Sequence, residues 1–419
     1  MSMSQLLILG VDTVLYVGAF GILFLSLILL TECIAALFPT SLPTDQCLWQ
    51  DTRVVVLVPA HNEAMGIRST LVGLLAILKK QDRLVVIADN CSDATAEVAR
   101  AAGAIVIERQ DLTRIGKGYA LDYGLRFTET DPPDVVVIVD ADCQVEPKAI
   151  ETLTQRALAT GRPMQATYLM EQPSSASPKH SISAFAFKVK NLVRPSGLGR
   201  LGLPCLLTGT GMAFPWSVIG SVDLASSHIV EDMKLGLDLT IAGYAPVFCS
   251  DANVTGRLPQ HDQAAETQRT RWEHGHLQSI LTYVPVLLKA ALQKRRFDLL
   301  ALALDLCVPP LSLLVVLWIG FSLSALVATC FGASWIPTGL LAITGLVLIS
   351  AIFAAWAKFG RADLPLRELL AIPFYILWKV PLYFNFLIRP QKTWVRTERD
   401  QVNPLQSGVI GGAVELLDD

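Results

Sequence analysis

Two acidic residues stand one residue apart at the end of an apolar run, where they could hold a metal ion. Asp140 and Asp142 follow the β-branched segment Val135–Val139. Burying unpaired carboxylates is costly, so this pair needs a cation or strong hydrogen bonds. A divalent ion such as Mg²⁺ meets this need, because it takes one or two carboxylates together with phosphate oxygens. The pair therefore predicts a metal site that stabilises a departing diphosphate.

A second acidic pair, Glu231–Asp232, could carry out proton transfer. It follows the segment 226–230 and opens a helical stretch. One of its carboxylates could be the general base that takes a proton from an acceptor hydroxyl. An acid at a helix N-terminus is also favoured by the helix dipole alone. Both interpretations stay open at this point.

Three further positions follow predicted strands or glycines and could bind a nucleotide. Asp89 follows Leu84–Ile87 and could accept a hydrogen bond from a base or ribose, although helix capping is an alternative that suits Asp93 better. The loop Pro59–Glu63 either lines a nucleotide pocket or only forms a turn. Lys117 lies between two glycines, where it either neutralises a phosphate or is a solvated lysine.

The last cluster is Gln268-Arg269-Thr270-Arg271-Trp272. The planar fork of Arg271 suits phosphate oxygens. Trp272 offers a flat apolar face of the sort on which a sugar can stack. The alternative is a basic anchor beside a membrane, with Trp272 at the interface.

Alternating strands and helices are predicted to position these residues. Between residues 53 and 248, short β-branched runs alternate with helical stretches, which predicts an α/β fold with a mainly parallel, doubly wound sheet. Ligands of such sheets bind beyond the carboxyl ends of the strands. No G-x-G-x-x-G follows the first strand, which disfavours a Rossmann dehydrogenase. The predicted strands are Val54–Val58, Leu84–Ile87, Ala104–Ile107 and Val135–Val139, and the predicted helices are Met65–Lys80, Asp93–Ala102, Gly118–Phe127 and Pro147–Ala159.

The composition of the 419-residue chain indicates a membrane protein. The mean hydropathy is +0.47 and the hydrophobic share is 52%. A net charge of −3 argues against a nucleic-acid partner. The eight cysteines form no C-x-x-C pair, which disfavours a zinc site or a disulfide framework and fits a reducing compartment. A transporter is disfavoured because it leaves the acidic residues at the strand ends unexplained.

Several apolar segments are candidates for membrane contact. Val11–Phe38 can cross a hydrocarbon core of roughly 30 Å, and no basic segment of a signal peptide precedes it. Leu306–Thr329 and Ile336–Ala357 are also predicted to span. Leu277–Gln293 is predicted to be an interfacial helix, because three basic residues follow it. Leu366–Ile388 is predicted to be re-entrant or interfacial, since a fourth span would place the basic cluster after it outside.

Taken in order, the motifs resemble the family 2 glycosyltransferases of the GT-A fold, the membrane-integrated group that includes cellulose, chitin and hyaluronan synthases. The motifs are PAHNE, ADNCSD, GKGYAL, DAD, TGTG, ED and QRTRW. The resemblance covers about residues 50–290. It extends more weakly to about residue 400, where Trp394 in KTWVRTER is similar to a cytoplasmic segment of several relatives.

The resemblance implies a role for each matching residue. Asp89 matches the acid that contacts uracil, and Asp140 matches an acid near the nucleotide. Asp142 matches the metal-binding acid, and Asp232 matches the catalytic base. It implies nucleotide-sugar binding by Pro59, Ala60, His61, Glu63, Asp89, Lys117, Asp140, Gln268 and Arg271, and acceptor binding by Thr208, Gly209, Thr210, Gly211, Glu231 and Trp272.

The implied reaction is inverting displacement. Asp232 deprotonates the acceptor while Mg²⁺ or Mn²⁺ holds the leaving diphosphate, so an α-linked donor, expected to be a UDP-sugar, gives a β-linked product. QRTRW is typical of processive members and favours polysaccharide synthesis. The alternative is transfer of a single sugar to a membrane lipid, because three spans are few for a translocation channel.

The expected protein is an integral protein of the inner or plasma membrane with a cytoplasmic catalytic domain. Its expected partners are the nucleotide sugar, a saccharide or lipid-linked acceptor, membrane lipids, and a further subunit or oligomer for export, without nucleic acid. The predicted divisions are a transmembrane helix in 1–45, a GT-A domain in 50–275, an interfacial helix in 276–298, two transmembrane helices in 299–360, a re-entrant or interfacial segment and a cytoplasmic basic segment in 361–400, and a flexible tail in 401–419.

Overall fold

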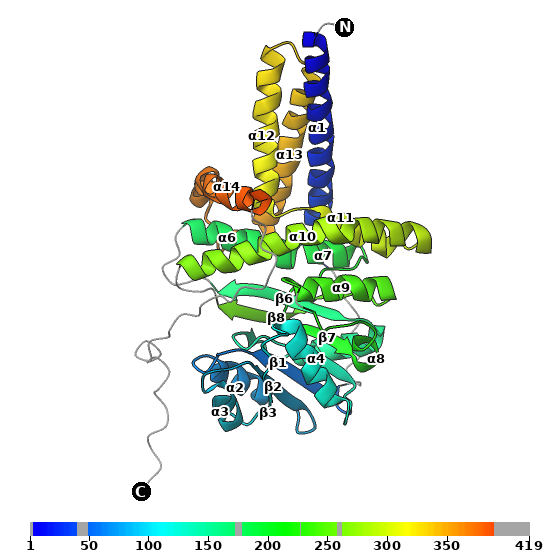
Figure 1. Cartoon of the computed structure of the whole chain (residues 1–419), viewed down its shortest axis with the longest axis vertical. Coiled ribbons are helices and arrows are strands. Elements are labelled where there is room, and N and C mark those ends of the chain that lie inside the picture. The colour runs from blue at the N-terminus through cyan, green and yellow to red at the C-terminus, as the bar shows by residue number, and fades with distance from the viewer. Residues whose placement is uncertain (1–2, 40–48, 172–177, 227, 258–261, 389–419) are drawn as a thin grey trace.

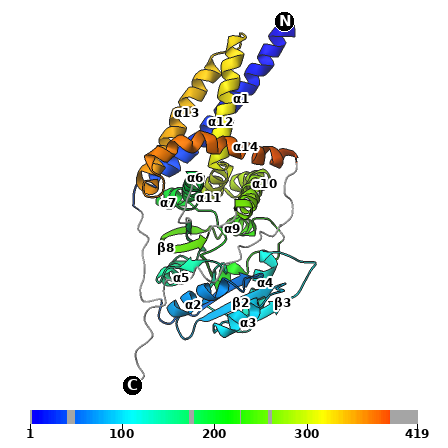
Figure 2. The same ribbon diagram turned by 90° about the vertical axis from the view of Figure 1, so that its left-hand side faces the viewer.

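The computed structural model describes residues 3–39, 49–171, 178–226, 228–257 and 262–388. An α/β part lies at one end, and a bundle of long helices projects from the other (Figure 1). A middle layer of helices separates the sheet from the long helices in both side views (Figures 1 and 2). This middle layer consists of α6 (Pro178–Lys188), the π-helical turn η2 (Val189–Val193), α7 (Arg194–Arg200), α10 (Asp262–Lys294) and α11 (Phe297–Cys307).

Within the described chain, the strands form one eight-stranded sheet of order β3-β2-β1-β4-β7-β6-β8-β5. The first four strands along the chain pair in parallel. Strand β7 runs antiparallel to both of its neighbours, so the sheet is mixed. The strands are β1 (Val54–Ala60), β2 (Arg83–Asp89), β3 (Ile105–Arg109), β4 (Val135–Ile138), β5 (Gln144–Val145), β6 (Met164–Glu171), β7 (Met212–Pro215) and β8 (Val247–Arg257).

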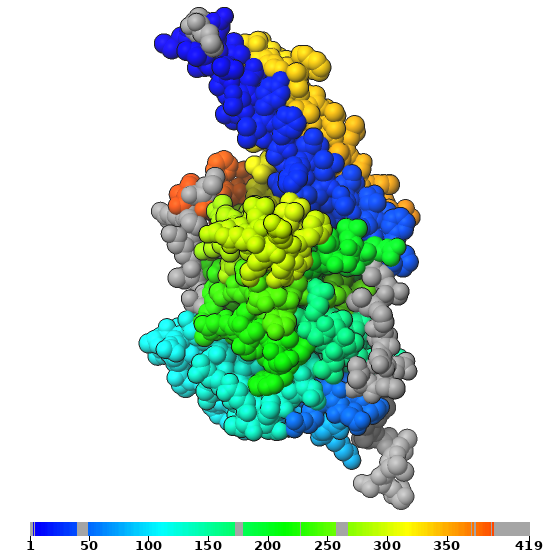
Figure 3. All heavy atoms as spheres, turned by 90° about the vertical axis from the view of Figure 1, so that its right-hand side faces the viewer, coloured from blue at the N-terminus to red at the C-terminus, as the bar shows by residue number. Residues whose placement is uncertain are grey.

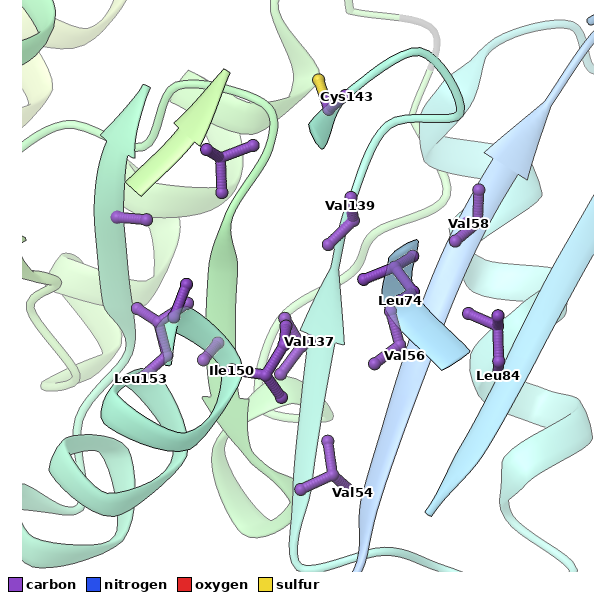
Figure 4. Close-up of a cluster of buried hydrophobic side chains, with 14 of the residues drawn as sticks. Val54, Val56, Val58, Leu74, Leu84, Val137, Val139, Cys143, Ile150 and Leu153 are labelled. Carbon is purple, nitrogen blue, oxygen red and sulfur yellow. The ribbon is translucent and has the colours of Figure 1, made fainter. Parts of the chain in front are cut away.

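Helices cover both faces of the sheet, which explains why the central strands are apolar without alternation. Val54, Val56 and Val58 pack on one face with side chains of α2 and α5 (Figure 4). Val55 and Leu57 pack on the other face with α4 and α9. These four helices and the two remaining short ones are α2 (Ile67–Ile77), α3 (Thr95–Ala101), α4 (Lys117–Thr128), α5 (Ala149–Thr160), α8 (Trp216–Ile219) and α9 (Glu231–Ala242).

The α/β fold predicted from the sequence is confirmed. All four predicted strands and all four predicted helices are present, with ends within three residues of the expected ones. The strands after residue 140 were not predicted. They include the antiparallel β7, which makes the sheet mixed beyond β4.

The described chain contains three helices that are long and apolar enough to cross a membrane. They correspond to the three predicted spans and form the stalk in Figure 3. Large apolar side chains such as Phe20, Leu323 and Leu346 stay exposed along them, as a lipid-facing surface requires. The spans are Gln5–Ala35 within α1 (Met3–Ala35), Leu311–Cys330 (α12), and Ile336–Gly360, which combines α13 (Ile336–Ala355) with the π-helical turn η3 (Trp356–Gly360).

Two helices lie at the base of the long helices. Helix α10 is continuous over Asp262–Lys294, so QRTRW and the predicted interfacial segment belong to one element and the expected boundary at 275/276 lies inside it. Helix α14 (Ile372–Ile388) follows the 3₁₀ turn η4 (Leu366–Ala371) and lies across the axes of the long helices (Figure 2). Its position at a membrane surface stays a prediction. Trp394, its basic segment and the predicted tail lie outside the described residues.

A buried ion triad joins the α/β part to the first long helix. The Nε atom of Arg194 donates to Oε2 of Glu32 at 2.6 Å, and its Nη2 donates to Oδ1 of Asp305 at 2.6 Å. All three side chains are buried. Helix α7 packs tightly on α1 beside the triad, because a Cβ at Gly197 would lie 2.0 Å from the carbonyl oxygen of Glu32. The triad therefore fixes the middle layer to the long helices.

Replacing Arg194 by Met should destabilise the protein strongly. It would leave two carboxylates buried without their partner, and breaking such a pair costs about 3–5 kcal/mol. Arg53 offers a matched control, because its ion pair with Asp131 is exposed, at 49% and 56% of the two side chains. Arg53→Met should cost less than about 1 kcal/mol. Thermal unfolding in detergent measures both variants, and equal melting temperatures would contradict the role of the triad.

Candidate active site

The carboxyl ends of the parallel strands meet at one edge of the sheet, and several predicted site residues gather there. Strand β1 ends at Ala60, β2 ends at Asp89, and Asp140 follows β4 by two residues. Ala60 pairs with Ala88 across the two strands, so the loops that follow them start side by side. Pro59 and Ala60 are themselves strand residues that pair with β2, rather than the loop residues expected from the sequence.

The loops after β1 and β2 form one hydrogen-bonded unit. The Nδ1 atom of His61 lies 2.6 Å from the carbonyl oxygen of Asp89. Asn62 exchanges hydrogen bonds with Ser92, at 3.0 Å to the hydroxyl and 2.7 Å from the backbone N–H. Asn62 and Asn90 have φ angles of 54° and 51°, a left-handed conformation that asparagine tolerates better than most residues. These contacts hold His61 beside Asp89.

The carboxylate of Asp93 serves the backbone of these loops. Its Oδ1 accepts a hydrogen bond from the N–H of Thr95 at 3.1 Å, and its Oδ2 accepts one from Ala64 at 3.1 Å. The backbone N–H of Glu63 donates to the Thr95 hydroxyl at 2.8 Å. Asp93 is therefore the capping acid, as its position suggested, and Asp89 remains for another role.

Asp89 is buried and paired with Arg109, a residue that the sequence analysis missed. Nη1 of Arg109 donates to Oδ1 of Asp89 at 2.6 Å. The guanidinium also donates to the carbonyl oxygen of Arg114 at 2.8 Å, and it lies 5.8 Å from the ring centre of Tyr119. The side-chain amide of Asn90 also donates to Oδ1 of Asp89, at 3.1 Å. Among the described residues, these bonds use only Oδ1, so Oδ2 can accept from a ligand.

Lys117 connects three segments at the centre of the site. It begins α4, and its Nζ forms an ion pair with Asp140 after β4. The same Nζ donates to the carbonyl oxygen of Gly209 at 2.7 Å. Burial opposes the charge of Lys117, but Asp140 and then Glu231 outweigh this effect, so the pKa of Lys117 is raised above its usual value. The cation is thus held in place where a phosphate could meet it.

Gly209 lets the acidic groups approach one another. Its φ of 94° is a conformation that favours glycine. A Cβ at this position would lie 3.3 Å from Oδ2 of Asp232, 3.7 Å from Nζ of Lys117 and 4.0 Å from Oδ2 of Asp140. The structure therefore brings the predicted base, phosphate-binding lysine and nucleotide-side acid together around one glycine.

Gln165 on β6, which the sequence analysis also missed, holds the rest of the TGTG segment through hydrogen bonds. Its Oε1 accepts from the backbone N–H of Thr208 at 2.9 Å, and its Nε2 donates to the carbonyl oxygen of Thr210 at 3.0 Å. The Thr210 hydroxyl in turn accepts from the N–H of Asp140 at 3.1 Å. A Cβ at Gly211 would lie 2.8 Å from the side chain of Ala166, so this glycine permits close packing. Thr208, Thr210 and Gly211 thus shape the loop.

Glu231 and Asp232 open α9 as predicted. Burial and the neighbouring carboxylate of Asp232 raise the pKa of Glu231 to about 7, against the opposing effect of Lys117 and Arg271. Arg271 of QRTRW, on α10, is thus among the charges that act on Glu231. The predicted acidic pair and the predicted phosphate-binding arginine therefore share one site.

The metal-binding residues fit a hard divalent ion. Single ligand atoms of Asp140, Asp142 and Cys143 lie within 4.8 Å of one another. Carboxylate oxygens are the ligands that Mg²⁺ and Mn²⁺ prefer, whereas a cysteine sulfur suits softer metals. The two aspartates therefore suit Mg²⁺ or Mn²⁺ together with phosphate oxygens.

The remaining QRTRW residues face the middle layer. The ring of Trp272 lies 5.6 Å from that of Phe187 on α6. Nη1 of Arg269 donates to the Ser183 hydroxyl at 3.1 Å, which ties α10 to the same helix. Gln268 lies one turn before Trp272 on α10 and is partly buried. Trp272 therefore already contacts one aromatic ring. It lies in the middle layer, between the site and the long helices.

The α/β part matches a known protein family. Residues 52–275 match the family described as Glycosyltransferase like family 2. The probable glycosyltransferase YdaM of Bacillus subtilis is 26% identical over 262 residues, which make up 59% of this chain and 60% of that protein. The 4,4'-diaponeurosporenoate glycosyltransferase of Staphylococcus haemolyticus is 28% identical over 44% of this chain and 50% of that protein. The chain therefore spans only about half of the length of such relatives.

A solved structure shows the same fold. The mannosyltransferase PcManGT from Pyrobaculum calidifontis, in complex with GDP-Man and Mn²⁺, superposes with a TM-score of 0.54 at 17% identity. The match covers 89% of this chain and 99% of that chain. The predicted GT-A fold is thereby confirmed.

The raised pKa of Glu231 predicts a pH-dependent contribution to stability. Its ordinary pKa is 4.5 and its folded value is about 7, so between these values the folded state keeps a proton that the unfolded state releases. The free energy of unfolding therefore falls as the pH rises through this window. Glu231→Gln cannot ionise, so it should melt above the wild type at pH 8, with the difference vanishing near pH 4. A difference in melting temperature between the two proteins that stays the same from pH 4 to pH 8 would contradict the burial of an ionisable group.

Proposed function

Because the chain belongs to glycosyltransferase family 2, we propose that it is an inverting hexosyltransferase that uses a nucleotide-diphosphate sugar, with UDP as the expected nucleotide. The observation that carries this proposal is the meeting of Lys117, Asp140 and Asp232 around Gly209. Groups that could bind a phosphate, lie beside a metal ion and take a proton are therefore gathered around one glycine, as a single active site requires.

We assign donor binding to the edge formed by β1, β2 and β4. Oδ2 of Asp89 would accept a hydrogen bond from the imide N–H of the base, while the ion pair with Arg109 holds the carboxylate in place. His61 and Glu63 belong to the loop beside it. Lys117, Gln268 and Arg271 would bind the diphosphate, since a lysine and an arginine fork together neutralise its charge.

Asp142 and Asp140 would hold a Mg²⁺ or Mn²⁺ ion beside this diphosphate. When bound, the ion would neutralise the charge that develops on the leaving nucleoside diphosphate. Mn²⁺ in the complex of PcManGT supports a divalent ion for this fold. Lys117 already pairs with Asp140, so the lysine and the diphosphate would both lie beside that carboxylate.

We propose Asp232 as the general base. Its Oδ2 lies beside the Gly209 position, 3.3 Å from where a Cβ would stand. It would take the proton of an acceptor hydroxyl while that oxygen bonds to the sugar C1 and the bond from C1 to the diphosphate breaks. Attack opposite to the leaving group inverts C1, which gives a β-linkage from an α-linked donor. Glu231, Trp272 and the segment from Thr208 to Gly211 would contact the acceptor.

We propose processive synthesis of a β-linked polysaccharide as the product, because QRTRW is typical of processive family members. A further subunit or an oligomer would then provide the route for export, since the described chain has three candidate spans. The alternative is transfer of a single sugar to a lipid. The name of the staphylococcal relative favours it, because 4,4'-diaponeurosporenoate is an apolar acceptor. A ladder of products from a labelled donor indicates a polymer, whereas one shifted product indicates a glycolipid.

We propose an integral membrane protein whose α/β part faces the cytoplasm, where nucleotide sugars are made. The three apolar helices support membrane insertion. The basic cluster after α14 supports the same orientation through the positive-inside tendency, although its residues lie outside the described chain.

Asp232→Asn should abolish transfer without abolishing donor binding. Loss of a general base typically lowers turnover by about 10²–10⁴-fold. The measurement is release of nucleoside diphosphate by purified protein in lipid, with a panel of UDP- and GDP-sugars. Asp238→Asn on the same helix is the control, because Asp238 pairs with Lys234 instead. A wild type that is inactive on the whole panel would refute the proposed function, and full turnover by Asp232→Asn would refute the base.

Asp142→Ala should remove metal-dependent donor binding. A hard divalent ion would lose an oxygen ligand, and the neighbouring Cys143 sulfur is a poor substitute for such an ion. Calorimetric titration of UDP at increasing Mn²⁺ measures the effect. Glu146→Ala is the control, because that exposed carboxylate binds Asn253. Equal metal stimulation in Asp142→Ala and wild type would rule out the assigned ligand.

A further inference from the structure

Lys190 is a basic side chain within the middle layer. It belongs to the π-helical turn η2, which joins α6 to α7. It is partly buried, yet among the described residues it makes no hydrogen bond or ion pair. Single π-helical turns are rare and frequently occur at functional sites. The groups that surround Lys190 therefore bear on its role.

Other basic residues around it already have acidic partners. Arg194 binds Asp305, and Lys379 forms a buried ion pair with Glu273. The carboxylates of these pairs are therefore compensated by cations other than Lys190. The remaining carboxylate with a notable electrostatic effect on Lys190 is that of Asp232.

Two contacts between α6 and α10 locate Lys190 relative to the site. Ser183 contacts Arg269, and one turn further Phe187 contacts Trp272. Lys190 lies one turn beyond Phe187 on the same helical stripe. It is therefore placed one turn past Trp272 along α10, within the middle layer that separates the sheet from the long helices (Figure 1).

The electrostatics of this place favour an added negative charge. Burial lowers the pKa of Lys190, and Asp232 opposes this only in part. Lys117 shows the contrast, because its direct ion pair with Asp140 raises its pKa. Burial, and then Lys190 and Arg194, lower the pKa of His276 well below its usual value, so His276 stays neutral and does not compete for an anion. An anion beside Lys190 would stabilise its charged form.

We propose that Lys190 binds a negatively charged group, a phosphate or carboxylate, of the acceptor. This inference rests on the proposed function and names its acceptor class: a molecule with an anionic group close to the hydroxyl that is glycosylated. The anionic group is held at Lys190 within the middle layer, and the hydroxyl reaches Asp232 past Trp272. Asp232 removes the hydroxyl proton as before, and the anionic group is bound but not consumed.

A pair of lipids tests the proposal. An alkyl glucoside and the corresponding glucosyl alkyl phosphodiester, of equal chain length and in phosphatidylcholine vesicles, differ in one negative charge. The preference is the ratio of nucleoside diphosphate release with the charged lipid to that with the neutral one. Wild type should prefer the charged lipid at least about tenfold, and Lys190→Met should lose about tenfold of this ratio, as for one charge-assisted hydrogen bond. Lys190→Arg should keep it.

The controls separate the possible failures. Lys148→Met removes an exposed lysine on α5's side of the sheet and should keep the preference. Equal release with both lipids in wild type would overturn the proposal, as would a loss in Lys190→Met that is the same for both lipids, since that would mean that Lys190 only supports Asp232. If wild type releases nucleoside diphosphate but shows either result, only this inference fails and the proposed function stands.

A soluble pair identifies the source of the anion. Glucosyl methyl phosphodiester and methyl glucoside carry the same difference in charge without a lipid chain. A Lys190-dependent preference in vesicles alone supports a lipid headgroup, and one in both pairs supports a phosphate that binds without its chain. Absence of the preference in both pairs overturns the site.

Discussion

The ion pair between Lys117 and Asp140, extended by the hydrogen bond to the Gly209 carbonyl, is the interaction on which the site depends. It joins the start of α4, the end of β4 and the loop before β7, three segments far apart along the chain. Gly209 has no side chain, so Asp232 can approach the same point from α9. The side chains proposed to bind the donor and the acceptor therefore meet because Gly209 carries no side chain, not because a long loop folds over them.

Much of the site could be predicted from the sequence, because its residues lie where strands end. Asp89, Asp140 and Lys117 each follow or begin an element whose pattern is plain in the sequence. Arg109 and Gln165 could not be found so directly. Arg109 closes β3, and its role depends on β3 lying beside β2. Gln165 is buried in β6, a strand that the alternating pattern did not reveal, and its amide serves backbone atoms of a loop more than 40 residues later.

The sequence also suggested a catalytic part that ends before an interfacial helix, and the structure joins the two. Helix α10 carries Arg271 toward Glu231 and Trp272 toward Phe187, then continues to Lys294 without a break. Its buried pair with Lys379 links it to α14. Periodicity alone could not show this continuity, because the polar motif and the apolar segment have different compositions.

The triad of Glu32, Arg194 and Asp305 has a consequence for how the protein is made. Synthesis runs from the N-terminus, and Arg194 follows Glu32 by 162 residues, while Asp305 comes 111 residues later still. The first long helix therefore reaches its membrane before the residue that will neutralise its acid has been translated. We expect the contact between this helix and the middle layer to form late in biogenesis, once α11 has emerged. The α/β part and the helical stalk thus complete their assembly together.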